Sequence, residues 1–145
     1  MSIRIIGKVV LGFSVALFAL MPGANDFTAR AQESGVNLAG TYEGKVARRF
    51  VKGGERETRL FRVTMNPDLN TGKVLVYELE GKLRNELAFV VKRASGTTFT
   101  GETVPINATP GYRPDRIKLM FARDGSWLNW SHTDGATEGS GTLRK

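Results

Sequence analysis

The sequence predicts an all-β protein: a single small antiparallel up-and-down β-barrel of about eight strands, with a β-sandwich as the alternative. From residue 38 onward, apolar and polar residues alternate with a period of two in short runs, which is typical of half-buried strands. Turn-forming residues, among them Asp124-Gly125 and Asp134-Gly135, separate these runs. Because the connections are short, sequential antiparallel pairing is favoured, and eight such strands can remove their exposed edges by closing.

The first 31 residues predict a cleavable export signal that precedes this fold. Arg4 and Lys8 form a positive start, and an apolar run follows at 9–20. Ala29 and Ala31 then give the small-x-small pattern that a signal peptidase cuts, so the mature chain is expected to begin at Gln32. An uncleaved membrane anchor is the alternative, although the run of about 12 residues is shorter than the roughly 20 that span a bilayer.

Export places the predicted single domain, residues 32–145, in the periplasm or outside the cell, with no membrane span after processing. This location excludes most nucleotide-driven chemistry and makes nucleic acid an unexpected partner. The chain has no cysteine, which excludes thiol catalysis, cysteine-ligated zinc and a lipoprotein anchor. Without the leader, 18 basic and 13 acidic residues remain, and this net charge of +5 favours anionic partners.

The first half of the domain carries four of the predicted strands. They are residues 38–50, 59–65, 73–81 and 86–93. A Gly53-Gly54 turn follows the first strand, and a loop rich in turn residues, 66–72, follows the second. We expect the inward faces of these strands to carry Leu38, Tyr42, Val46, Phe61, Val63, Leu75, Tyr77, Leu79, Leu87 and Phe89.

The second half carries the other four predicted strands, residues 97–104, 116–123, 126–133 and 136–144. The tight turn Ser95-Gly96 leads into the first of them, and residues 105–114, with three prolines, are the only long irregular stretch. The inward candidates here are Phe99, Ile117, Leu119, Phe121 and Leu143. An eight-stranded barrel is just wide enough to be filled by side chains or to hold one small ligand. With this many large residues inside, we expect a mostly filled core and any cavity near one mouth.

The segment 37–42, Asn-Leu-Ala-Gly-Thr-Tyr, resembles the first-strand Gly-x-Trp signature of lipocalins and other calycin-like barrels, with Tyr42 in place of the tryptophan. In those families a basic residue of the last strand packs over the aromatic ring and closes the barrel. The resemblance implies that Arg144 plays this part here. It covers two short segments and supports a fold class without transferring a ligand.

Three groups of residues are candidates for catalysis. The only histidine, His132, lies between Ser131 and Asp134, but neighbours on a strand point to opposite faces and cannot form a triad. We therefore expect a surface histidine beside a turn. The carboxylate pairs Glu55/Glu57 and Glu78/Glu80 have a spacing of the order that glycosidases use, but solvated outer-face positions explain them.

The candidate contact residues are aromatic and basic. Trp127 and Trp130 lie three positions apart, so one is expected in the core and the other exposed, where it can contact a ligand. Tyr42 and Arg144 complete the candidate ligand contacts. Basic residues cluster at Lys92-Arg93 and in the segment Arg113-Arg116-Lys118. If the second strand returns beside the first, one patch for an anionic surface should form from Arg48, Arg49, Lys52, Arg56, Arg59 and Arg62.

These observations predict an exported, non-enzymatic binding protein that needs no cofactor or metal. Its ligand is expected to be a small apolar molecule or an anionic cell-envelope component. The alternative is a protein-directed role, the inhibition of an extracytoplasmic hydrolase through residues 105–114. A lined cavity would favour the first function, and a filled barrel with a rigid projecting loop would favour the second.

Overall fold

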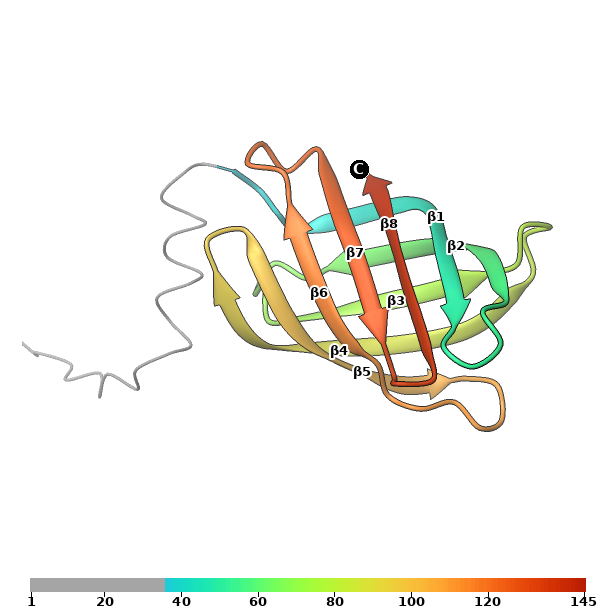
Figure 1. The fold of residues 1–145 in the computed structure, drawn as a ribbon. Helices are drawn as coiled ribbons and strands as arrows, with labels where there is room; N and C mark the ends of the chain where they lie inside the picture. The colour runs from blue at the N-terminus through green and yellow to red at the C-terminus, as the bar shows by residue number, and fades with distance from the viewer. Residues whose placement is uncertain (1–35) are drawn as a thin grey trace, which may run out of the picture.

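The computed structural model describes residues 36–145, so the expected leader, with Ala29, Ala31 and Gln32, lies outside the described residues. Eight strands form one closed antiparallel barrel in which each strand pairs with the next and β8 pairs with β1. Figure 1 shows β8 beside β1, where the barrel closes. The barrel predicted from the sequence is confirmed over the sandwich. The strands are β1 (Gly40–Phe50), β2 (Arg56–Met65), β3 (Thr71–Tyr77), β4 (Leu83–Ser95), β5 (Thr98–Asn107), β6 (Arg116–Phe121), β7 (Trp127–Thr133) and β8 (Thr137–Arg144). Within this part of the chain, no helix is long and apolar enough to cross a membrane.

The turns between strands adopt the backbone conformations that their glycine and aspartate residues favour. At the β7–β8 turn, Gly135 has a φ of +89°, a conformation that glycine adopts without steric cost. The Asp134 carboxylate accepts hydrogen bonds from the backbone N–H groups of Ala136 (2.8 Å) and Thr137 (2.6 Å) and so fixes the turn. The irregular stretch is shorter than predicted, because residues 105–107 continue β5 opposite the start of β4.

Large side chains fill the apolar part of the barrel. Trp130 lies at its centre, and its ring contacts Phe61 and Phe89 at centroid distances of 5.8 and 6.5 Å. Tyr42 and Phe99 each pack edge-on against Phe121, with centroids 5.4 Å apart. Burial of these rings is the main stabilising contribution in a chain without disulfides.

The inward face of β3 differs from the prediction. Val74 and Val76 point into the core, whereas Leu75 and Tyr77 lie on the outer wall and Leu79 is exposed in the β3–β4 turn. Both phases of this segment are apolar, so the period of two cannot choose between them. The small valines point inward because the facing aromatic rings already occupy the interior, and Arg62 covers the outward Tyr77 ring.

The two ends of the barrel differ in character. Leu38 and Leu69 are buried at one end, which we call the closed end. At the other end, which we call the mouth, most of the inward positions are polar or charged. Arg48, Glu57, Asp115 and Thr137 occupy these positions. Figure 1 shows the tip of β1, the β7–β8 turn and the β5–β6 connection at this same end.

Candidate functional site

The motif that resembles the lipocalin signature lies at the closed end. Tyr42 is fully buried, and its hydroxyl donates to the carbonyl oxygens of Leu38 (3.0 Å) and Gly125 (3.1 Å). The basic residue over its ring is Lys145, whose Nζ lies 5.5 Å from the ring centroid. Arg144, predicted for this part, is exposed on the outer wall, because successive residues of a strand point to opposite faces.

The same contact explains why residue 40 of this motif, Gly40, is a glycine. Its φ is +124°, and a Cβ there would lie 2.8 Å from Cε of Lys145. Glycine therefore allows the Lys145 side chain to cross the start of β1 and donate to the carbonyl oxygen of Asn37 at 2.8 Å. Tyr42 is thus part of the closure of the barrel and does not line either of the two cavities described below.

His132 is buried, which corrects the prediction of a surface histidine. The residue lies on the inward face of β7, where its ring stacks on Phe61 at 5.6 Å and its Nδ1 accepts a hydrogen bond from Nε1 of Trp130 at 2.8 Å. Burial, assisted by the nearby Arg48 charge, lowers the pKa of His132 to about 4, so the ring is neutral near pH 7. The sequence-based error arose because a histidine next to a turn was assigned to the wrong face of its strand.

The two tryptophans separate as expected. Trp130 is buried in the core, and Trp127 is 38% exposed on the outer wall at the closed end. Trp127 does not line either of the cavities described below.

The carboxylate pairs do not converge, and their predicted outer-face positions are wrong for one member of each pair. Glu57 lies on the same face as Phe61 and accepts hydrogen bonds from Arg48 (2.7 Å) and Arg59 (2.8 Å) at the mouth. Glu78 lies next to Arg59 (3.7 Å) and Arg84 (3.3 Å). The five side chains thus alternate in sign, and each carboxylate stabilises two guanidinium groups.

The structure divides the predicted basic patch between two faces. β2 does return beside β1, and Arg49 and Arg56 face each other on the outer wall. Arg48 and Arg59 point into the mouth instead. Lys52 lies in the β1–β2 turn, and Arg62 is paired with Glu43 farther along the wall. Pairing alone therefore does not assemble six basic residues, because alternation along each strand separates them.

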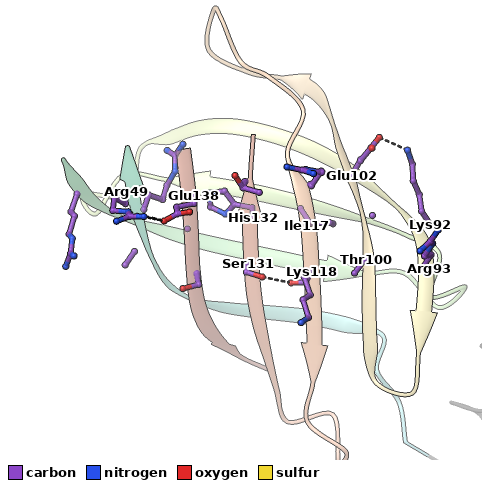
Figure 2. A pocket seen from close by; sticks show the side chains of 18 residues that line it. Arg49, Lys92, Arg93, Thr100, Glu102, Ile117, Lys118, Ser131, His132 and Glu138 are labelled. Carbon is purple, nitrogen blue, oxygen red and sulfur yellow. Dashed lines mark hydrogen bonds and ion pairs between the residues drawn. The ribbon is translucent and has the colours of Figure 1, made fainter. Parts of the chain in front are cut away.

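A larger basic surface lies across the outer wall, where residues of seven strands line a groove with a volume of about 1130 Å³ (Figure 2). Its central cross-strand row consists of four small side chains and one lysine. These residues, in order from β1 through β8, β7 and β6 to β5, are Ala47, Ser140, Ser131, Lys118 and Thr100. The next row, starting on β2, is Arg56, Arg49, Glu138, Thr133, Arg116 and Glu102. Lys92 and Arg93 of β4 border the far end.

Positive charge dominates this groove, which we call the basic groove. Six outward cations, Arg49, Arg56, Lys92, Arg93, Arg116 and Lys118, face two acids, Glu102 and Glu138. Arg49 is paired with Glu138, and Lys92 with Glu102 at 2.6 Å. Within the described residues, the other four cations form no ion pair. The sequence shows these cations in separate short basic segments. Only closure of the barrel brings the cations of β4 and β6 onto the same surface as those of β1.

In comparisons with known proteins, no family model and no curated protein matches this sequence. In the part of the chain that the structure describes, no three acidic or histidine side chains lie close enough to hold a metal ion.

Proposed function

We propose that this chain is an exported, non-enzymatic binding protein whose basic groove holds an extended, acidic cell-envelope polysaccharide. The observation that carries the proposal is the pair of adjacent cross-strand rows, in which small side chains are flanked by cations. A row of cations raises the local concentration of an anionic polymer and strengthens its binding.

The shape and chemistry of the basic groove favour a polysaccharide over a lipid surface. A groove lined by seven strands fits a chain-like polymer better than a flat bilayer. Thr100, Ser131, Thr133 and Ser140 offer hydroxyl groups that can exchange hydrogen bonds with sugar hydroxyls. Arg116 and Lys118, which lie on neighbouring rows, are free to pair with carboxylates.

A small apolar ligand has less support as the ligand class. Tyr42, Phe89 and Trp130 are at most 1% exposed, so their rings already occupy the apolar interior. The groups considered for catalysis are likewise engaged: His132 contacts Trp130, and Glu57 and Glu78 contact arginines. This engagement supports a binding role over an enzymatic one.

The proposal is tested with sodium polygalacturonate as the probe, on protein purified from the exported fraction of its host. Replacing Arg116 and Lys118 together by glutamine should weaken the binding about tenfold, which corresponds to ~1.4 kcal/mol. The matched control replaces Lys82 and Arg123 by glutamine, since both are exposed and lie outside the groove. The control loses the same charge and should weaken the binding less than threefold.

Three results would reject the proposal. Equal losses in the two double variants would show that net charge alone drives binding. No binding of polygalacturonate at low ionic strength would leave the groove without its ligand. Binding to phosphatidylglycerol vesicles but not to the polymer would replace the polysaccharide with a lipid surface.

Inhibition of a hydrolase through the β5–β6 connection remains the second candidate. Tyr112 anchors this connection by hydrogen bonding to Asp115 at 2.9 Å, and Asn85 accepts a hydrogen bond from the N–H of Thr109 at 2.9 Å. Rigidity of this kind suits an inhibitory loop, but the same anchors fold the connection onto the barrel. An activity assay with a panel of secreted hydrolases distinguishes the two candidates, because only the inhibitor lowers a turnover rate.

A further inference from the structure

The mouth of the barrel contains a second cavity, separate in chemistry from the basic groove. Its volume is about 250 Å³, the volume of roughly eight water molecules in the liquid. A molecule the size of an amino acid fits such a space, whereas a polymer does not. The lining is dominated by charged and hydrogen-bonding side chains, so an apolar occupant would leave them unpaired.

The two sides of this mouth differ in net charge. Arg59 and Arg84 come from β2 and β4 and, with Arg48, outnumber Glu57 of β2, which also lines the cavity. Asp115 precedes β6 and Asp134 follows β7, and the two aspartates outnumber Arg113 of the β5–β6 connection. In a closed barrel of eight consecutive strands, β2–β4 face β6–β7 across the interior. Arg48 of β1 lies between the two sides and reaches the start of β8, where Nη2 is 3.5 Å from Oγ1 of Thr137.

Several of these groups have hydrogen-bonding capacity that the protein itself does not use. Nε of Arg48 is buried and has no hydrogen-bond partner, although Nη1 is bonded to Glu57. Asp115 accepts the Tyr112 hydroxyl through Oδ2, and Asp134 uses Oδ1 for its turn. Among the described residues, Oδ1 of Asp115 and Oδ2 of Asp134 accept no hydrogen bond. Unused polar groups in a partly buried site favour a ligand that completes them.

The β5–β6 connection covers part of the same cavity. Thr109, Pro110, Gly111, Tyr112 and Arg113 all line it. The Tyr112 hydroxyl lies between Thr103 and Asp115, and this contact holds the connection against the barrel. The cavity is therefore walled by strands on its sides and partly covered by a rigid segment.

We propose that the mouth binds a small zwitterion, a free α-amino acid, with its carboxylate toward Arg48 and Arg59 and its ammonium group toward Asp115 and Asp134. A simple anion would meet the two aspartates without a compensating charge, and a simple amine would lie near Arg48, Arg59 and Arg84, which outnumber their partners Glu57 and Glu78. An uncharged sugar would leave Nε of Arg48 and the free carboxylate oxygens of Asp115 and Asp134 without a charged partner. Only a molecule with both charges matches both sides of the mouth.

The test measures the melting temperature of the purified protein with each L- and D-amino acid at roughly 10 mM. A ligand that binds only the folded chain raises the melting temperature, and we expect a rise of several degrees for the best one. Its N-acetyl derivative lacks the ammonium group and its methyl ester lacks the carboxylate. Each derivative should give less than a third of that rise.

Variants then assign the site. Asp115→Asn and Asp134→Asn should each weaken the binding of the best amino acid at least tenfold, measured by calorimetry. The Arg116/Lys118 glutamine variant of the basic groove should bind that amino acid unchanged, and Asp134→Asn should bind polygalacturonate unchanged. The proposal for the mouth and the proposal for the basic groove can thus be rejected independently of each other.

The proposal is overturned if no amino acid raises the melting temperature, or if the acetylated or esterified derivative binds as well as the parent. Because these derivatives need no variant, the test holds even if an aspartate substitution impairs folding. Equal stabilisation by acetate or phosphate would replace the zwitterion with a simple anion.

Discussion

At the residue scale, His132 is the side chain whose chemistry depends most on its surroundings. Its Nδ1 accepts the Trp130 N–H, which places the ring proton on Nε2 in the neutral form. A charged ring would lose this acceptor and would lie beside Arg48 inside the barrel. The histidine is therefore a structural partner of the central tryptophan.

The lowered pKa of His132 predicts a pH-dependent stability. Between about pH 4 and pH 6.5 the unfolded chain binds a proton that the folded chain does not, so the free energy of unfolding falls as the pH is lowered. The full loss is up to about 3 kcal/mol. It is measured by urea unfolding at pH 7.5 and pH 4.5.

His132→Asn is the matched variant for this measurement, since its amide oxygen can replace Nδ1 as the acceptor and does not titrate. The carboxylates titrate in both proteins, so the difference between their pH profiles isolates the histidine. Asp115, whose pKa burial raises, is among the groups that cancel in this way. Equal pH profiles for the two proteins would contradict the prediction.

At the scale of the strand, the alternation of apolar and polar residues determined which of the predicted inward positions the structure confirms. Val63 and Phe89 were placed correctly because the phenylalanine of β2 and that of β4 each share a phase with most of the other large apolar residues of the strand. β3 was misplaced because both of its phases are apolar, and the choice depends on the aromatic rings that face it. A cavity near one mouth was expected, but its charged lining was missed for a related reason: Glu57 and Arg59 share the inward phase of Phe61, and charged residues are usually assigned to solvent.

The seam between β1 and β8 depends on close backbone approach. A Cβ at Gly141 would lie 2.2 Å from the carbonyl oxygen of Lys45 and 3.0 Å from Cα of Val46. Both obstacles belong to the backbone, so a rotamer change cannot relieve the clash. The glycine allows the last strand to complete the barrel.

Gly141→Ala is therefore expected to destabilise the protein by about 1–3 kcal/mol or more, the usual range for overpacking. Ser140→Ala is the control, because its side chain points outward one position away and its loss should change the stability by about 0.5 kcal/mol or less. Urea unfolding of both variants measures the difference. Equal stabilities would mean that the seam relaxes without cost.

At the scale of the whole molecule, closure links the two ends of the described chain. β1 and β8 hydrogen-bond to each other, and Lys145 contacts both Asn37 and the Tyr42 ring. Removing any strand would expose two edges and open a core that one set of rings fills. The strands should therefore unfold together.

This closure predicts a single cooperative transition in urea. The fluorescence of the tryptophans, dominated by the change at the buried Trp130, should have the same midpoint as the loss of strand signal in far-ultraviolet circular dichroism. In Gly141→Ala both midpoints should move together, because the seam belongs to the same unit as the core. A strand signal that persists after Trp130 becomes exposed would instead show that part of the sheet is stable without closure, and the seam would then be a local contact.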